Sequence, residues 1–177
     1  KAITDDVGES TIEELVNAAF TMSKPKTGAL IVIERKDILV NIEKTGILIN
    51  GIVSSQLLIN IFEHNTPLHD GAVLIRGNTI VSATCYLPLS ENMRISKDLG
   101  TRHRAAIGIS EVSDSITIVV SEETGRVSVA LGGNLIRVND SEELRKELSV
   151  LLENTAEEKK SSLWSKLLKG RGNEKDK

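Results

Sequence analysis

The spacing of apolar and polar residues along the chain predicts helices and strands that alternate. Apolar side chains recur every three or four positions over residues 10–22 and 54–62, which is the spacing of one buried helix face. Two further helices are predicted over residues 100–109 and 140–152, and Asp140 and Glu143 form a capping box at the start of the second. Short apolar runs predict buried strands. They cover residues 29–33, 47–49, 52–53, 72–75, 79–87, 116–120, 127–131 and 135–138.

Turn signals between these strands favour one fold class. Residues 76–78 connect two strands closely enough for a hairpin, and Asn50-Gly51 predicts a turn between two short apolar pieces. A hairpin among alternating helices and strands favours an α/β fold with a mixed central β-sheet flanked by helices, rather than a purely parallel sheet. We therefore assign residues 1–152 to one domain. Residues 153–177 are rich in charge, which predicts a disordered or loosely helical tail.

The two ends of the chain carry further expectations. Residues 163–169 are weakly amphipathic, and a solvated tail is a simpler interpretation than contact with a membrane surface or a partner. No apolar stretch approaches the roughly 18 residues of a membrane span, and no signal peptide opens the chain. Because the chain begins with Lys1 rather than Met, we expect a fragment that lacks upstream segments.

Composition narrows the function classes. The chain has 177 residues, of which 40% are apolar but only 2% aromatic, so the core must consist of Ile, Val, Leu and Ala. The net charge of −3 gives no overall basic surface for nucleic acid, and any phosphate ligand must be held by a few placed cations. The single cysteine, Cys85, cannot form an internal disulfide, which favours a reducing compartment, and we interpret it as a small buried side chain.

The loop before the strand at 72–75 holds the first candidate site residues. Asp70 precedes Gly71 at a loop-to-strand junction, where a carboxylate can reach a bound cation while glycine lets a ligand approach the backbone. His69 can add a nitrogen ligand to the same cation. The structural alternatives are an Asx-type turn for Asp70 and a hydrogen-bonded loop histidine for His69.

A basic triplet at the predicted start of the helix at 100–109 holds the second group. Backbone N–H groups at a helix start favour an anion. Arg102 and Arg104 add planar guanidinium groups, each of which can donate two parallel hydrogen bonds to phosphate oxygens. Thr101 supplies a hydroxyl and His103 a further donor. The alternative is a solvent-exposed basic turn. An acidic metal ligand together with a phosphate-binding triplet favours phosphoryl or nucleotidyl transfer, which depends on positioning and charge neutralisation.

Other polar positions give weaker signals. The carboxylates of the turn at 121–124 can accept from an adenine amino group or simply solvate a hairpin, and Tyr86 and Leu87 end a strand where they could contact a base. Gly132-Gly133-Asn134 fits a phosphate cradle or a tight bend equally well. The sequence contains no Walker A loop, dinucleotide fingerprint, zinc-finger spacing or nucleophile elbow.

The two motifs together resemble a known family. The segments LHDGA at 68–72 and GTRHRAA at 100–106 are similar to the DGA and RHR motifs of the diadenylate cyclase (DAC) domain, in the same order. The resemblance covers residues 10–152. The flanks resemble the membrane-anchored type of Gram-positive bacteria, in which transmembrane helices precede the domain. The chain would then be the cytoplasmic domain of a bacterial cell-membrane protein.

This resemblance implies a reaction and a set of residues. Two ATP molecules, one on each subunit of a face-to-face homodimer, would give cyclic di-AMP and two pyrophosphates, with Mg²⁺ or Mn²⁺ required. By similarity, Asp70 and His69 are the metal ligands. The catalytic residues are Asp70, Arg102, His103 and Arg104. The substrate-binding residues are Gly71, Ala72, Tyr86, Leu87, Thr101, Arg102, Ser121 and Glu123.

Two other functions stay open at this stage. One is a catalytically silent module that senses adenine nucleotides, and the other is a metal-dependent phosphohydrolase. Intact Asp70 and Arg102 argue against a silent module, and the absence of further Asp or His clusters argues against a hydrolase. A regulatory protein partner and the identity of the metal are not decided by the sequence.

Overall fold

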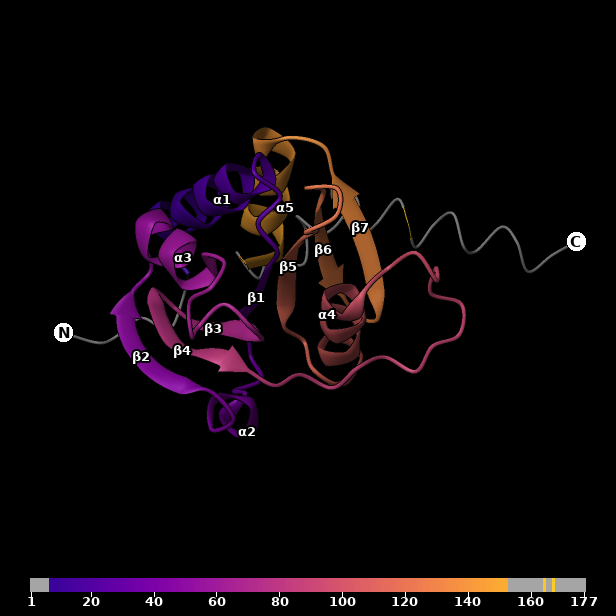
Figure 1. Cartoon of the computed structure of the whole chain (residues 1–177), viewed down its shortest axis with the longest axis horizontal. Helices are drawn as coiled ribbons and strands as arrows, with labels where there is room; N and C mark the ends of the chain where they lie inside the picture. Colours follow the sequence, from indigo (N-terminus) through magenta and orange to yellow (C-terminus); the bar gives the residue numbers. More distant parts are fainter. Residues whose placement is uncertain (1–6, 153–163, 165–166, 168–177) are drawn as a thin grey trace, which may run out of the picture.

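The computed structural model describes residues 7–152, 164 and 167, and its strands form one mixed sheet (Figure 1). The helices are α1 (Glu9–Ser23), α2 (Val40–Glu43), α3 (Ser55–Phe62), α4 (Thr101–Val112) and α5 (Ser141–Leu152). The strands are β1 (Ala29–Ile33), β2 (Ile47–Ile52), β3 (Ala72–Arg76), β4 (Thr79–Cys85), β5 (Ile116–Val120), β6 (Val127–Leu131) and β7 (Asn134–Val138).

The sheet has seven strands in the order β2-β4-β3-β1-β5-β6-β7. Only β1 and β3 run parallel, and every other neighbouring pair is antiparallel. Strands β1 and β5 are buried along their whole length, as expected for the middle of a sheet covered on both faces. The predicted α/β class with a mixed, helix-flanked sheet is confirmed.

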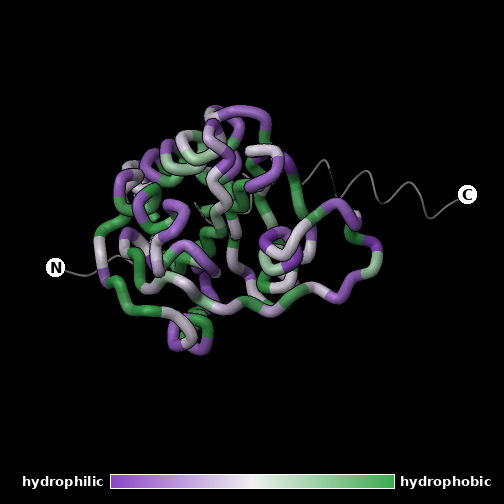
Figure 2. Tube along the Cα trace, viewed as in Figure 1, coloured by the Kyte–Doolittle hydropathy of each residue, from purple (hydrophilic) through white to green (hydrophobic). Residues whose placement is uncertain are grey.

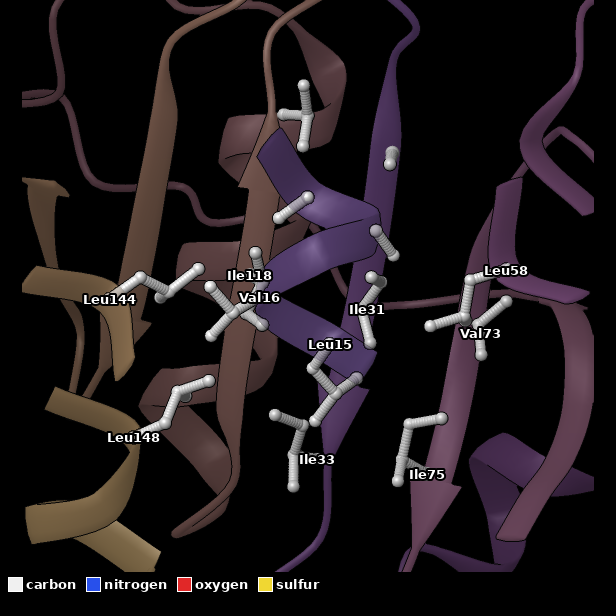
Figure 3. Close-up of a cluster of buried hydrophobic side chains, with 14 of the residues drawn as sticks. Leu15, Val16, Ile31, Ile33, Leu58, Val73, Ile75, Ile118, Leu144 and Leu148 are labelled. Carbon is white, nitrogen blue, oxygen red and sulfur yellow. The ribbon is translucent and has the colours of Figure 1, made fainter. Parts of the chain in front are cut away.

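Helices cover the two faces of the sheet unequally. Helices α1, α3 and α5 pack on one face, where Leu15 of α1 lies beside Ile31 of β1 and Val16 lies beside Ile118 of β5 (Figure 3). Helix α4 packs on the other face against a smaller cluster that includes Leu30 and Val32. Because side chains of a strand alternate between faces, the consecutive apolar residues of β1 serve both layers. Figure 2 shows hydrophobic segments gathered in the sheet and hydrophilic ones in the outer loops.

The structure differs from the sequence-based prediction at two places. Asn50-Gly51 does not end a strand, because β2 continues through it as one strand paired with β4. The register shifts between Leu48 and Gly51, and Asn50 has a positive φ of 51°, so the turn-forming residues make a bulge instead. Helix α2 was not predicted, since four residues are too few to show helical periodicity.

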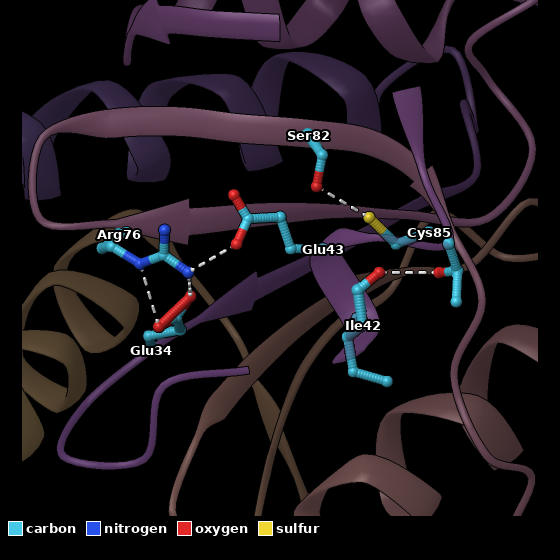
Figure 4. Close-up of polar contacts among 7 residues, drawn as sticks. Glu34, Ile42, Glu43, Arg76, Ser82 and Cys85 are labelled. Atoms are coloured by element: carbon cyan, nitrogen blue, oxygen red, sulfur yellow. Dashed lines mark hydrogen bonds and ion pairs between the residues drawn. The ribbon is translucent and has the colours of Figure 1, made fainter. Parts of the chain in front are cut away.

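Helix α2 is held by an ion pair as well as by the packing of Ile42 against the cluster on the α4 side of the sheet. Arg76 at the end of β3 donates to Glu34 Oε1 at 2.8 Å and to Glu43 Oε2 at 3.1 Å (Figure 4). Glu34 is buried, so its carboxylate needs this partner.

At the start of α5 the predicted capping residues are confirmed. Asp140 accepts from the Glu143 N–H, and Glu143 accepts from the Asn139 N–H.

One side chain of the C-terminal segment belongs to the core. Trp164 is buried and joins the cluster beneath α1 and α5, and Leu167 packs against that cluster. Trp164 is therefore not solvated. The other residues of the 153–177 segment lie outside the described part of the chain, and the division of the chain after residue 152 stays a prediction.

Replacing Trp164 with Ala is expected to destabilise the protein without changing its chemistry. Deleting a buried aromatic side chain costs about 3 kcal/mol, which lowers the thermal midpoint of a protein of this size by roughly 10 °C. Thermal unfolding followed by circular dichroism measures the shift. Trp164→Phe keeps most of the buried ring and should lose much less. An unchanged midpoint in Trp164→Ala would show that the indole contributes nothing to the core.

Candidate active site

Asp70 lies where the loop after α3 enters β3, and its side chain is 83% exposed. The next residue, Gly71, has a positive φ of 79°. A Cβ at Gly71 would lie 2.7 Å from the Cys85 carbonyl oxygen and 2.9 Å from the Thr84 carbonyl carbon. Only glycine therefore fits between the loop and β4, and the exposed Asp70 carboxylate lies directly before this close approach, at the start of β3.

The His69 ring is held so that one nitrogen faces Asp70. His69 Nδ1 lies 2.6 Å from the Thr66 carbonyl oxygen, which can only accept, so Nδ1 carries the proton. His69 Nε2 lies 3.3 Å from Asp70 Oδ1. A metal-binding histidine usually has one ring nitrogen hydrogen-bonded in this way, which orients the other nitrogen toward the metal.

The donors at this loop fit a divalent cation shared with a substrate. Mg²⁺ commonly binds one or two carboxylates and takes its remaining ligands from water and substrate phosphates. Asp70 and His69 together present one carboxylate oxygen and one ring nitrogen to the same point. Among the described residues, no group of three or more His, Cys, Asp and Glu side chains could hold a metal ion. The carboxylate and the ring nitrogen fit a cation that takes its remaining ligands from water and substrate phosphates.

Helix α4 begins with an open N-terminus. Its N-cap residue, Gly100, supplies no side-chain cap, and the first turn contains no acidic residue. A Cβ at Gly100 would meet nothing within 4 Å, and residues 100–103 line a pocket at the start of the helix. The N–H groups of the first turn and the helix dipole favour an anion in that space.

Arg102 is positioned by two residues outside its own helix. Its Nη1 lies 3.1 Å from Glu122 Oε2 in the turn between β5 and β6. The guanidinium also lies flat against Gly28, because a Cβ there would be 2.5 Å from Arg102 Cζ. Gly28 is not in a positive-φ conformation, so the absence of its side chain matters only for the space that it leaves to Arg102.

The next two residues of the basic triplet have different surroundings. His103 is 8% exposed, and burial together with the Arg102 charge lowers its pKa, so the ring is neutral near pH 7. Arg104 lines neither of the two pockets described below. Residues two apart on a helix are separated by about 200°, so Arg102 and Arg104 leave α4 on nearly opposite sides.

Two adjoining pockets contain most of the predicted site residues. The strand pocket, of about 340 Å³, lies at the start of β3 and the end of β4. It is lined by Leu30, Asp70, Gly71, Thr84, Cys85, Tyr86, Leu87, Leu89, Thr101, Arg102 and Ala105. The DGA and RHR motifs thus meet in one pocket, although β4 and a long loop separate them in the chain. Tyr86 is 80% exposed at the rim, and its N–H donates to Thr45 Oγ1.

The turn pocket, of about 420 Å³, lies between the N-terminus of α4 and the turn from β5 to β6. It is lined by Asp98, Leu99, Gly100, Thr101, Arg102, His103, Ser121, Glu122, Glu123, Thr124, Arg126, Ser128, Leu135 and Arg137. Ser121 Oγ accepts from the N–H groups of Glu123 and Thr124, which shapes the turn. Thr101 and Arg102 line both pockets and therefore mark the place where they join.

The remaining predicted residues lie elsewhere. Ala72 is fully buried in β3 and contributes no side chain to either pocket. Gly132 and Gly133 have positive φ values of 58° and 79° and form the tight connection between β6 and β7. Of the two interpretations of this segment, the structure supports the tight bend and gives no support to the phosphate cradle. Three residues near the site were not predicted from the sequence: Gly28, Arg126 and Arg137. The only sequence signal for the two arginines was a single charge beside an apolar strand, directly before β6 for Arg126 and within β7 for Arg137.

Comparison with known proteins identifies the family. Residues 16–135 match the family described as "DAC: DisA bacterial checkpoint controller nucleotide-binding". The chain belongs to this family. The match contains both motifs and every predicted site residue, from His69 to Glu123.

Individual relatives agree with this assignment. The chain is 51% identical over 160 residues to "Cyclic di-AMP synthase CdaA" of Bacillus subtilis, which covers 90% of this chain and 59% of that protein. A crystal structure of a double mutant of DacA from Staphylococcus aureus superposes with a TM-score of 0.78 at 48% identity, covering 80% of this chain and 94% of that one. A "hypothetical membrane spanning protein" from Bacillus cereus gives a TM-score of 0.72 at 45% identity, covering 77% of this chain and 66% of that one.

Proposed function

We propose that this protein is a diadenylate cyclase that joins two ATP molecules into cyclic di-AMP and releases two pyrophosphates. The observation that carries the proposal is the meeting of Asp70 and Arg102 in one pocket, with Arg102 also lining a second, polar pocket. The proposal is further supported by the family and by the Bacillus subtilis relative named as a cyclic di-AMP synthase. That relative is longer, since this chain spans 59% of its length.

The two pockets divide the substrate between them. Leu30 and Leu87 give the strand pocket an apolar lining that suits the adenosine of ATP. We therefore assign the adenosine to this pocket, beside Tyr86. The α-phosphate then lies at the junction, within reach of the Thr101 hydroxyl and the Arg102 guanidinium. The remaining phosphates enter the turn pocket, where the open end of α4 favours negative charge.

The chemistry needs one proton removed and one leaving group neutralised for each bond. The oxygen of a 3′-hydroxyl bonds to the α-phosphorus of the other ATP, the bond from that phosphorus to the bridging oxygen breaks, and pyrophosphate leaves. Asp70 is the residue placed to help remove the hydroxyl proton, and Arg102 balances charge on the phosphates. A bound Mg²⁺ or Mn²⁺, held by Asp70 and His69, would lower the pKa of the hydroxyl.

The reaction requires two subunits, because each chain offers one set of pockets and the product contains two nucleotides. Asp70 is 83% exposed in the single chain, which is consistent with a carboxylate that faces a second subunit across the site. We therefore propose that two chains meet face to face, so that each ATP lies opposite the other.

Incubation with ATP and Mg²⁺ or Mn²⁺, followed by chromatography of the nucleotides, tests the activity directly. A cyclic dinucleotide peak supports the cyclase. Binding of ATP without turnover would favour the silent nucleotide sensor, and ADP or AMP as the product would favour a phosphohydrolase. Either of these results overturns the proposal.

Mixing subunits tests the dimer. Excess Asp70→Asn protein added to wild type should suppress cyclic product, because a mixed dimer aligns one competent half with one inactive half and forms a linear intermediate at most. Labelled subunits must confirm that exchange has occurred. Undiminished cyclic product after confirmed exchange would mean that one chain completes the reaction alone.

Replacing Gly28 with Ala is expected to reduce activity at least about tenfold while leaving the fold intact, because the new methyl group displaces the Arg102 guanidinium from the phosphate position. The flexible end of Arg102 can move aside, so the thermal midpoint should change by only a few degrees. Gly8→Ala is the matched control, since a Cβ there meets only Asn78 Oδ1 at 3.7 Å. Full activity in Gly28→Ala would show that Arg102 does not need this position.

We further propose that the domain is attached to a membrane through a segment outside this chain and works on the cytoplasmic side, where ATP is available. The structural neighbour from Bacillus cereus named as membrane spanning supports this attachment. In the described part of the chain, no helix has both the length and the apolar character needed to span a bilayer.

A further inference from the structure

We propose that Arg126 and Arg137 bind the terminal phosphates of the substrate and thereby make the site selective for a nucleoside triphosphate. This inference rests on the proposed function, since it assigns a role to two side chains of the turn pocket. Neither residue belongs to the DGA or RHR motif. Arg126 directly precedes β6 and Arg137 lies in β7, the last two strands of the sheet order, and only the fold brings both residues to the α4 side.

The strand register places both arginines on one face. Ser128 of β6 lies directly opposite Arg137 of β7, and residues opposite each other in an antiparallel pair share a face. Arg126 precedes Ser128 by two positions, which returns it to the same side of the strand. Ala130, two positions further along, packs in the core cluster beneath α4, so this face is the one that α4 covers.

The charges in the pocket leave these two guanidiniums available. Arg102 is paired with Glu122 at 3.1 Å. Within the described residues, the side chains of Arg126 and Arg137 form no ion pair, and both residues are exposed to the pocket. Asp98, Glu122 and Glu123 also line the pocket, and Glu122 is the carboxylate that pairs with Arg102. The guanidiniums of Arg126 and Arg137 and the uncapped N-terminus of α4 line the same pocket, and each favours a bound anion.

The order of the pockets fixes which phosphates these residues reach. Thr101 and Arg102 stand at the junction, which is the place for the α-phosphate when adenosine fills the strand pocket. The β- and γ-phosphates then extend away from the adenosine, along the turn pocket toward β6 and β7. When the bond to the α-phosphorus breaks, these two phosphates leave together as pyrophosphate, and guanidinium groups neutralise the charge that develops on them.

A comparison of two ligands separates this role from a general effect on the site. Arg126→Gln, Arg137→Gln and the double variant are titrated calorimetrically with AMP and with α,β-methylene-ATP, which cannot release pyrophosphate. The double variant should bind the triphosphate analogue at least about tenfold more weakly, the scale of one lost charge-assisted contact, and AMP within about twofold of wild type. Arg94→Gln, an exposed arginine outside both pockets, is the matched control and should change neither affinity.

The outcomes decide the inference independently of turnover. Selective loss of the triphosphate analogue supports the phosphate-binding role, even if the wild-type protein were to make no cyclic product. Equal losses for both ligands, or no loss for either, would overturn it, even if the cyclase activity were established. In an active enzyme, the same variants should raise KM for ATP and also lower kcat, because the contacts persist to the leaving pyrophosphate.

Discussion

Replacing Asp70 with Asn is expected to lower the rate of cyclic di-AMP formation at least about 100-fold, the scale typical of a lost catalytic group. Asparagine keeps the size of the side chain but cannot accept a proton, and it binds a divalent cation weakly. The side chain is 83% exposed and lies beside His69, with Oδ1 3.3 Å from His69 Nε2, so the fold should not depend on it. Steady-state assays with chromatographic detection of product measure the loss.

Two controls make this result specific to the site. The thermal midpoint of Asp70→Asn should stay within a few degrees of wild type. Glu63→Gln removes an exposed carboxylate outside both pockets, at the end of α3, and should keep its activity. Retained activity in Asp70→Asn would remove Asp70 from the catalytic machinery and leave only its role in the turn before β3.

Replacing Arg102 is expected to give graded losses. Arg102→Lys keeps the charge but loses the planar fork, and about a tenfold loss of kcat/KM is expected. Arg102→Ala also loses the charge at the junction of the pockets, and about a 100-fold loss is expected. Because Glu122 is paired with Arg102, the alanine variant also leaves this carboxylate without its cationic partner beside the incoming phosphates.

The graded pattern is what identifies a phosphate-binding guanidinium. Arg94→Ala serves as the control for removing an exposed arginine and should have near-native kinetics. If Arg102→Lys and Arg102→Ala were equally and nearly fully active, the triplet would be only a surface turn. Arg104→Ala measured beside them decides whether the second arginine contributes, since it lines neither pocket in the single chain.

Most of the secondary structure could be predicted because it depends on local patterns. The burial of every residue of β1 and β5 follows from unbroken apolar runs, and α1 and α3 follow from apolar spacing. The failures have local causes as well. Asn50-Gly51 is a turn signal, but pairing with β4 makes it a bulge within β2. Helix α2 has only four residues, too few to show an apolar period, and its Glu43 pairs with Arg76 from a distant part of the chain.

The sequence by itself determined the fold class and the residue types that carry the proposed chemistry, because helix and strand periods and the two motifs are local properties of the chain. Only the tertiary structure decided that Asp70 and Arg102 share a pocket and that Arg104 does not. It also decided that Gly28 makes room for Arg102 and that Arg126 and Arg137 reach the turn pocket, which Arg102 lines as well. These relations join residues far apart in the chain. They follow from strand order and register, which local spacing does not encode.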